Sequence, residues 1–401
     1  LINAEDGNVV DSAGVINPQT SYGADIVSRL GNVVQDACIG NILQERLVDE
    51  INKQTAELCR KNGYMPENIV HAVFVGNTAM HHLFFGLAVE QLVNSPYVPA
   101  ISQEHQIKGW ELGLAFSPGA YASWLPVIAG YVGPDHLAVL LAEDALRKKN
   151  NVVFIDIGTN TEMSLAAGDR IYTVSAPSGP AFEGAHIRHG MRAVPGAIDT
   201  FRIDEDGAFR FTTIGGAKPK GICGSGMLDI ITEAFTAGIL DWRGRLQKHS
   251  RVVVSDQKKR LIVAEAAESE AKEEIFLSQK DIREFQLVKG AITSGIFVLA
   301  ESAGIGLNDI TEVIVAGAFG TYINVENALC IGMFPFHEET TVRKAGNAAG
   351  AGACIAAADA DARERVRQLC EKIQYIELVN APGFKKTFAR ATFFGKVLNK
   401  N

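Results

Sequence analysis

Three apolar runs along the chain each end in a glycine and pass into a polar turn or a helical pattern. They lie within residues 72–80, 152–161 and 313–320. A short apolar run bounded by turn residues is typical of a strand that is buried on both faces. The three segments repeat a pattern and share no close sequence identity, which argues against a solenoid. We therefore predict an α/β protein of two lobes, with strand ends facing a shared cleft.

Helical periodicity and turn residues predict the remaining elements. Helices are expected at 23–31, 35–43, 46–62, 80–85 and 137–146, and a β-hairpin at 163–175. Pro96, Pro99 and Pro118 predict an irregular stretch over residues 88–124. The turn residues at 5–8 predict a hairpin, and because no initiator Met precedes them we expect a fragment that begins partway through a strand.

A helix start at residues 133–135 (GPD) marks the boundary that we predict between the lobes. Proline is tolerated in the first turn of a helix, and an apolar segment follows it. Residues 1–132 are predicted to form the first lobe and residues 133–401 the second. A chain of 401 residues is long enough for two cores. The charged stretch 257–280 predicts a solvated insertion or an exposed hairpin.

Charge and composition narrow the classes of function. A net charge of −8 without a basic block argues against a nucleic-acid partner. No apolar stretch reaches the length of a membrane span. The six cysteines are dispersed, and none has the spacing of a local zinc or iron–sulfur motif. This usage indicates reduced thiols in a cytoplasmic protein.

The clearest chemical signal is the sequence DIGTNT at residues 156–161, which ends the second apolar run. A glycine at a strand end lets backbone amides approach phosphate oxygens, and Thr159, Asn160 and Thr161 add side-chain donors. Asp156 lies inside an otherwise apolar strand, where a carboxylate needs a cation or a cluster of hydrogen bonds. The alternative is a buried acid that caps a tight turn.

Two further glycine-rich segments could contact a nucleotide. Gly224-Ser225-Gly226 opens a helical pattern, which suits an anion at the positive helix end but equally suits a simple helix start. Gly317-Ala318-Phe319-Gly320 follows the third apolar run and could let a nucleoside lie on the backbone. The small residues at 346–352 predict a helix used for close packing.

Residues 178–184 (SGPAFEG) and the polar residues after them predict a loop that borders the cleft. His186 and His189 have a spacing that could ligate a metal, but no third ligand is evident nearby. His81 and His82 are expected to lie with one side chain in the core and the other in solvent.

Taken in order, these segments resemble the superfamily of acetate and sugar kinases, heat-shock chaperones and actin. Residues 156–161 resemble its phosphate-2 loop, 313–320 its adenosine motif, and 133–141 its first connecting helix. Segments spread over nearly the whole chain resemble corrinoid-activating enzymes in particular. These segments are 17–19, 22–25, 74–80, 178–184, 224–229 and 281–283.

The resemblance implies a two-lobed actin-like (ribonuclease H-like) ATPase fold with a nucleotide cleft between the lobes. It implies ATP and Mg²⁺ as ligands, with Asp156 supporting Mg²⁺ through water and Asp135 orienting the attacking water or the metal. It assigns the phosphates to Gly158, Thr159, Asn160 and Thr161. It assigns the nucleoside to Gly224, Ser225, Gly226, Gly317, Ala318, Phe319 and Gly320.

Corrinoid-activating enzymes use ATP hydrolysis to drive the reduction of cob(II)alamin to cob(I)alamin in the corrinoid proteins of methyltransferase systems, such as O-demethylases. The resemblance thus implies a cytoplasmic ATPase domain of an anaerobe, with a corrinoid protein as partner and a homodimer as assembly. The family's phosphate-1 loop is expected just before Leu1. Its [2Fe–2S] domain is expected only in the full-length protein, and residues 387–401 carry no cysteine-rich extension.

Two alternatives from other classes stay open. A small-molecule kinase of the same superfamily would place acceptor-binding residues in the first lobe, where no charged cluster suits a sugar or acetate. A non-hydrolysing actin-like scaffold would keep the fold without turning over ATP. The sequence does not identify the cognate corrinoid protein or the surface used for dimerisation.

Overall fold

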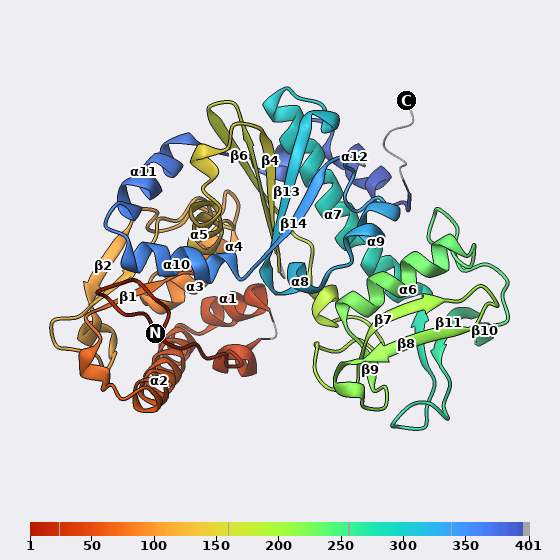
Figure 1. Cartoon of the computed structure of the whole chain (residues 1–401), viewed down its shortest axis with the longest axis horizontal. Coiled ribbons are helices and arrows are strands. Elements are labelled where there is room, and N and C mark those ends of the chain that lie inside the picture. The colour runs from red at the N-terminus through yellow and green to blue at the C-terminus, as the bar shows by residue number, and fades with distance from the viewer. Residues whose placement is uncertain (24, 159, 256, 338, 396–401) are drawn as a thin grey trace. The chain divides into compact units, whose positions relative to one another are not determined.

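The computed structural model describes residues 1–23, 25–158, 160–255, 257–337 and 339–395 (Figure 1). The chain divides into two compact units. The first comprises Leu1–Lys149, Gly168–Ile171 and Asn347–Tyr375, and the second comprises Asn150–Ala167, Tyr172–Gly346 and Ile376–Asn401. This division differs from the predicted boundary between residues 132 and 133.

The first unit is built around a small sheet with the strand order β1-β3-β2. Its strands are β1 (His71–Phe74), β2 (His105–Lys108) and β3 (Tyr121–Trp124), and the short β15 (Ile373–Tyr375) ends its last segment. Its helices are α1 (Ile26–Gln35), α2 (Cys38–Lys61), α3 (Thr78–Phe84), α4 (Glu90–Val93), α5 (Pro134–Ala142), α10 (Ala348–Ala358) and α11 (Ala362–Lys372). Strands β1 and β3 are parallel, so both of their carboxyl ends lie at the same edge of the sheet.

The predicted close packing of the small-residue segment is confirmed in this unit. Helix α10 packs on α5, and a Cβ atom added to Gly352 would lie 2.0 Å from the carbonyl oxygen of Ala138. Only a residue without a side chain permits this approach of the two backbones. The same contact explains why the start of α5 belongs to the first unit and not to the second.

The second unit contains a larger sheet in which β14, β13, β4, β5 and β6 are neighbours in that order. Its strands are β4 (Asn151–Ile157), β5 (Thr161–Ala167), β6 (Arg170–Ala176), β13 (Ile310–Ala316) and β14 (Thr341–Gly346). The predicted strands at 152–157 and 313–316 and the predicted hairpin at 163–175 are thereby confirmed. Helix α7 (Gln279–Ala303) packs on this sheet, where Gly295 meets the side chain of Met163.

Two smaller sheets and the remaining helices complete the second unit. Strands β7 (Ala197–Ile203), β8 (Phe209–Thr213) and β9 (Gly221–Ile222) form one sheet, and β10 (Val252–Ser255), β11 (Lys258–Ala264) and β12 (Ile275–Ser278) form the other. The helices are α6 (Gly224–Thr236), α8 (Gly317–Tyr322), α9 (Val325–Cys330) and α12 (Phe384–Ala391). In the second of these sheets the charged stretch pairs as a hairpin, but it is not the exposed hairpin that was predicted, because Leu261, Val263, Ile275 and Leu277 are buried in the core.

Two sequence-based predictions were wrong. The helices expected at 35–43 and 46–62 are one helix, α2, which begins at Cys38 and continues through the polar residues Gln44 and Glu45. The stretch 88–124, expected to be irregular, contains α4, β2 and β3. Pro96, Pro99 and Pro118 lie in the connections between these elements, so they do not disturb them. Over the described residues, none of the helices is both long and apolar enough to cross a membrane.

Candidate nucleotide site

Asp156 lies near the carboxyl end of β4, directly beside the glycine that follows β13. The parallel register pairs Asp156 with Ala316, and Gly317 comes next. A Cβ atom on Gly317 would lie 2.4 Å from Oδ1 of Asp156 and 2.7 Å from the carbonyl oxygen of Ile157. Gly317 also has a φ of +88°, a conformation that favours glycine. The segments predicted to bind phosphate and adenosine therefore touch each other at this point.

A second carboxylate, Glu162, lies opposite Asp156 in the antiparallel register of β4 and β5. The Glu162 side chain is buried, and Ser175 Oγ donates a hydrogen bond of 3.5 Å to its Oε1. Directly opposed acids on one face of a sheet repel each other, and a nearby cation relieves that repulsion. Sequence reasoning passed over Glu162, although an acid directly after the glycine-rich turn was a usable signal.

The turn after β4 is tied to the segment that follows β6. The Gly158 amide donates to the Asn160 carbonyl oxygen at 3.1 Å. The hydroxyl groups of Thr161 and Ser178 are 2.8 Å apart, and Ser178 Oγ also donates to the Gly158 carbonyl oxygen at 3.5 Å. Thr161 is fully buried, so its hydroxyl group serves to anchor the turn. Thr159 lies outside the described residues.

Phe319, from the predicted adenosine motif, stacks on Phe182 of the loop 178–184. The ring centroids are 3.9 Å apart, and the ring planes differ by 7°. Gly224 lies against both residues, since a Cβ atom there would be 2.4 Å from the Phe182 carbonyl oxygen and 2.8 Å from the Phe319 ring. Three glycine-rich segments that are far apart in the sequence thus meet around one aromatic pair.

Helix α6 begins at Gly224, as predicted, and no side chain caps its first turn. Gly226 is required by packing, because a Cβ atom there would lie 2.1 Å from the carbonyl oxygen of Ile198. The Ser225 hydroxyl lies 3.4 Å from the Cys223 sulfur. The structure shows the packing role of these glycines, whereas the binding of an anion by the first-turn amides stays a prediction.

Asp229, one turn further along α6, is a buried acid that sequence reasoning did not select. It accepts hydrogen bonds from Asn327 Nδ2 at 2.6 Å and from the Phe201 amide at 3.3 Å. Burial raises the pKa of Asp229 to about 6. The contact with Asn327 connects α6 to α9, the helix after the adenosine motif. An acid in the apolar run 227–231 was the signal that could have indicated it.

Asp135, the other predicted catalytic residue, belongs to the first unit. It lies in the first turn of α5, where its Oδ1 accepts the amide hydrogen of His136 at 2.9 Å. Burial raises the pKa of Asp135 to about 6. The turn before it packs on the end of β1, because a Cβ atom on Gly133 would lie 2.4 Å from the Gly76 carbonyl oxygen. The connections that follow β1 and β3 therefore meet at Asp135.

The histidines of the chain do not form a metal site among the described residues, where no group of three or more His, Cys, Asp or Glu side chains could hold a metal ion. The expectation that only one of His81 and His82 lies in the core was wrong, since both are fully buried. His82 accepts the Ala100 amide hydrogen at its Nε2, and the His81 ring packs edge-on to Trp124. Burial lowers the pKa of His81 to about 3.

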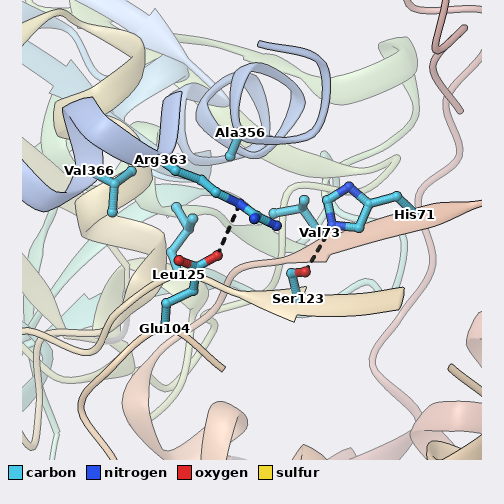
Figure 2. A pocket seen from close by; sticks show the side chains of 8 residues that line it. All are labelled: His71, Val73, Glu104, Ser123, Leu125, Ala356, Arg363 and Val366. Carbon is cyan, nitrogen blue, oxygen red and sulfur yellow. Dashed lines mark hydrogen bonds and ion pairs between the residues drawn. The ribbon is translucent and has the colours of Figure 1, made fainter. Parts of the chain in front are cut away.

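Two cavities of the first unit lie away from the predicted site residues. The smaller one, of about 10 Å³, is bordered by a hydrogen bond of 2.8 Å between His71 and Ser123 and by an ion pair of 3.4 Å between Arg363 and Glu104 (Figure 2). It has room for a single water molecule. The larger one, of about 550 Å³, lies among residues 1–10, α2, β1 and α10.

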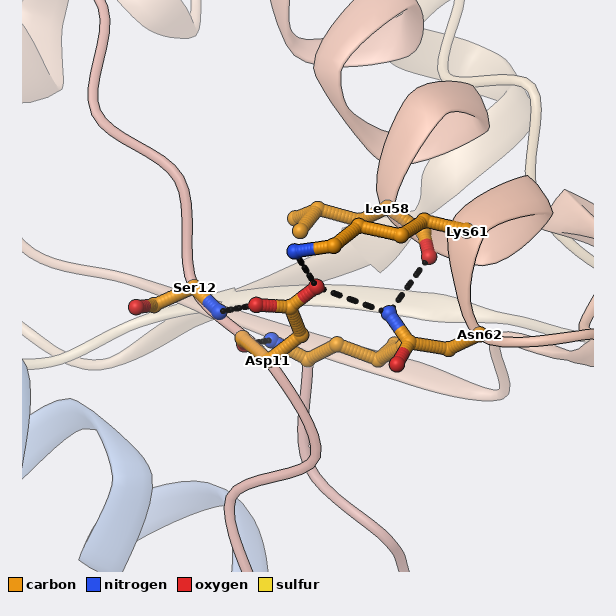
Figure 3. Close-up of polar contacts among 6 residues, drawn as sticks. Asp11, Ser12, Leu58, Lys61 and Asn62 are labelled. Carbon is orange, nitrogen blue, oxygen red and sulfur yellow. Dashed lines mark hydrogen bonds and ion pairs between the residues drawn. The ribbon is translucent and has the colours of Figure 1, made fainter.

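The first residues of the chain are anchored to the end of α2. Asp11 forms an ion pair of 2.8 Å with Lys61 and accepts a hydrogen bond of 2.9 Å from Asn62 (Figure 3). These two partners hold the pKa of the Asp11 carboxyl group well below its usual range. An isolated β-bridge between Ile2 and Val9 confirms the predicted turn at residues 5–8.

Comparison with known proteins assigns this chain to a protein family. The family model for the C-terminal domain of RACo, described as the ASKHA domain, matches residues 150–399. The model for the RACo middle region matches residues 1–148. Together they cover nearly the entire sequence. The chain belongs to the family of reductive activators of corrinoid proteins.

Individual members of this family support the assignment. The chain is 32% identical over 405 residues to the corrinoid activation enzyme RamQ of Eubacterium limosum, covering 98% of this chain and 68% of that protein. It is 28% identical over 239 residues to the reductase of a methylated amine-specific Co(II) corrinoid protein of Methanosarcina barkeri, covering 54% of this chain and 41% of that protein.

A solved structure, the reductive activator for a corrinoid, iron–sulfur protein, is also similar to this chain. It superimposes with a TM-score of 0.86 at 32% sequence identity, over 98% of this chain and 63% of that one. The chain therefore spans about two thirds of the length of that activator. This match confirms the predicted actin-like α/β fold of the superfamily of acetate and sugar kinases, heat-shock chaperones and actin.

Proposed function

We propose that the protein containing this chain hydrolyses ATP to drive the reduction of cob(II)alamin to cob(I)alamin in a corrinoid protein. The observation that carries the proposal is the contact of Gly317 with Asp156 in a chain of the reductive activator family. The Gly317 backbone is in contact with the Asp156 carboxylate. The proposed phosphate-binding turn and the proposed adenosine-binding segment are expected to lie side by side at such a contact.

The residues of the second unit fit Mg-ATP. Asp156, at the carboxyl end of β4 and opposite Glu162, is proposed to hold Mg²⁺ through water. Bound Mg²⁺ supplies charge neutralisation of the phosphates. Gly158, Thr159, Asn160 and Thr161 are proposed to line the phosphates, Thr161 through its backbone because its buried hydroxyl group pairs with Ser178. Gly224–Gly226 together with Gly317–Gly320 are proposed to line the nucleoside. Glycine at positions 224, 226 and 317 lets these segments pack directly on their neighbours, which brings the backbone of the proposed nucleoside segments close together.

Asp135 is proposed to orient the attacking water or the metal from the first unit. Its carboxyl group, with a pKa raised to about 6, is ionised at neutral pH and can accept a hydrogen bond from water. Phosphoryl transfer to water requires mainly positioning of this kind, together with stabilisation of charge. The products are ADP and phosphate.

The electron that converts cob(II)alamin to cob(I)alamin is proposed to come from a [2Fe–2S] domain of the full-length protein. ATP hydrolysis can drive this step only if the nucleotide-bound states differ in their affinity for the corrinoid protein. A corrinoid protein as partner, a homodimeric assembly and a cytoplasmic location belong to the same proposal.

Steady-state ATP hydrolysis, measured with and without a corrinoid protein, tests this function. We expect hydrolysis without any phosphoryl acceptor, a higher rate with the corrinoid protein, and loss of Mg²⁺-dependent turnover in Asp156→Asn. Asp206→Asn, in the exposed turn before β8, is the matched control and should retain the rate. Transfer of phosphate to a small molecule would favour a kinase, and binding without turnover would favour a scaffold.

A further inference from the structure

The segment between β6 and the loop at Gly184 contacts both parts of the candidate nucleotide site. At its beginning, the Ser178 hydroxyl lies 2.8 Å from the Thr161 hydroxyl and donates to the Gly158 carbonyl oxygen at 3.5 Å. At its end, the Phe182 ring stacks on Phe319 at 3.9 Å. The two contacts are four residues apart, and they reach the phosphate-binding turn and the adenosine motif, respectively.

Both contacts are shielded from water, so each has a defined geometry. Ser178 is 5% exposed and Phe182 is 6% exposed. A hydroxyl pair buried in this way is costly to break, because the remaining partner loses its hydrogen bond without gaining one from water. The aromatic pair adds a preferred relative orientation of the two rings.

The residues between the two contacts form a short connection that includes one proline. Pro180 occupies the first turn of the short 3-10 helix Pro180–Glu183, and the Ser178 amide donates to the Ala176 carbonyl oxygen at 2.8 Å. Proline fixes its own φ and restricts the residue before it. Gly179, with a φ of +77°, is the one residue between Ser178 and this helix, so a displacement of Ser178 is expected to reach Phe182 over a short path.

We propose that Ser178 and Phe182 are positioning residues that couple the phosphate-binding turn to the adenosine motif. The position of each of these two segments then depends on the position of the other. This inference rests on the proposed ATPase function. Neither side chain needs to touch the nucleotide. Ser178 acts through Thr161 and Gly158, and Phe182 acts through Phe319 and the Gly224 backbone.

The closing experiment is a double-mutant cycle of Ser178→Ala and Phe182→Leu, with kcat and KM for ATP hydrolysis measured on the native protein that contains this chain. Ser178→Ala is expected to lower kcat about 10-fold with little change in KM, because the phosphate-binding turn is displaced. Phe182→Leu is expected to raise KM about 10-fold, because the adenosine motif is displaced. If the two residues are coupled, the fold-loss in kcat/KM of the double variant should be smaller than the product of the two single fold-losses, by a factor of at least about 5.

Matched controls separate positioning from general stability. Ser164→Ala removes a buried hydroxyl pair of 2.7 Å with Thr173 on the same sheet, and Phe209→Leu disrupts an aromatic pair of 5.1 Å with Phe201 in the same unit. Both should lower the melting temperature as much as the test variants while leaving kcat and KM within about 2-fold. If Ser178→Ala does not fold, Thr161→Val removes the same hydroxyl pair from its other side.

The outcomes distinguish this inference from the function on which it rests. A wild-type protein that neither binds nor hydrolyses ATP contradicts the proposed function itself. Active wild-type protein with strictly additive losses, or with control variants as impaired as the test variants, overturns the coupling alone. Non-additive losses confined to Ser178→Ala and Phe182→Leu support it.

Discussion

The carboxylate of Asp156 lies so close to the backbone of Gly317 that a single added carbon atom would be 2.4 Å from Oδ1. Two strands, β4 and β13, bring these residues together because they pair in parallel and end at the same edge of the sheet. The contact joins two segments that are far apart in the sequence, and the proposed nucleotide site depends on it.

Gly317→Ala should therefore destabilise the second unit and abolish nucleotide binding. The positive φ and the collision with Asp156 and Ile157 together cost about 3 kcal/mol. Gly304→Ala is the control, since Gly304 has a φ of +68° but open space around it, so only the backbone strain remains. Chemical denaturation and nucleotide titration measure both effects. Equal behaviour of the two variants would show that the contact with Asp156 is unimportant.

Replacing either of two helical glycines by alanine should change the free energy of unfolding, in opposite directions for the two positions. Gly352→Ala should lower the free energy of unfolding by about 2 kcal/mol, because the new methyl group collides with the Ala138 backbone. Gly31→Ala in α1 should raise it by about 0.7 kcal/mol, because no atom lies within 4 Å of the added carbon and alanine favours the helix. Chemical denaturation of both variants is the measurement, and a stabilised Gly352→Ala would contradict the close packing of α5 and α10.

His81 predicts acid sensitivity of the first unit. Its folded-state pKa is lowered from 6.5 to about 3, so below pH 6.5 the unfolded state takes up a proton that the folded state does not. Stability is thus fully present above pH 6.5 and falls as the pH decreases, by about 2 kcal/mol at pH 5 from this residue. Trp124, with its ring 5.2 Å from His81, provides a fluorescence signal for unfolding.

His81→Phe should reduce this pH dependence by the part that His81 contributes, while the buried His136, whose pKa is also lowered to about 3, keeps the rest. The exposed His337→Gln should leave it unchanged. An unaltered slope between pH 7 and pH 5 in His81→Phe would show that another group causes the acid sensitivity.

Asp135 predicts the pH dependence of ATP hydrolysis. With a pKa raised to about 6, its carboxyl group loses its proton as the pH rises through 6, and the carboxylate is the stronger hydrogen-bond acceptor for the water that Asp135 is proposed to orient. We expect kcat to rise through this range and then to level off. Asp135→Asn should lower kcat and remove the rise, whereas Asp144→Asn, in the half-buried turn after α5, should keep both. If kcat still rises with pH in Asp135→Asn, a different titrating group causes the rise.

Much of the second unit could be predicted from the sequence, because β4 and β13 are buried on both faces and consist of continuous apolar runs. Strands β2 and β3 could not, since β2 is partly exposed and contains Gln106 and Lys108, and neither strand alternates clearly. The pairing of β3 with β1 and of β2 with β3 is a tertiary effect.

The candidate site, too, could be predicted only in part from the sequence. Asp156 and the glycines at 158, 224, 226 and 317 stand out as local motifs, so their selection needed no structure. The stack of Phe182 on Phe319 and the opposition of Asp156 and Glu162 arise only from the pairing of distant segments. Contacts of this kind cannot be predicted from the residues next to each position in the sequence. The roles assigned to the site residues stay predictions.

The most direct test of the account is a calorimetric titration of the native protein with a non-hydrolysable ATP analogue, in Mg²⁺ and in a chelator, for the wild type and Asp156→Ala. We predict binding at least about 10-fold tighter with Mg²⁺ in the wild type, and a ratio near unity in Asp156→Ala. Absence of binding in the wild type, or an unchanged Mg²⁺ dependence in Asp156→Ala, would contradict the proposed nucleotide site.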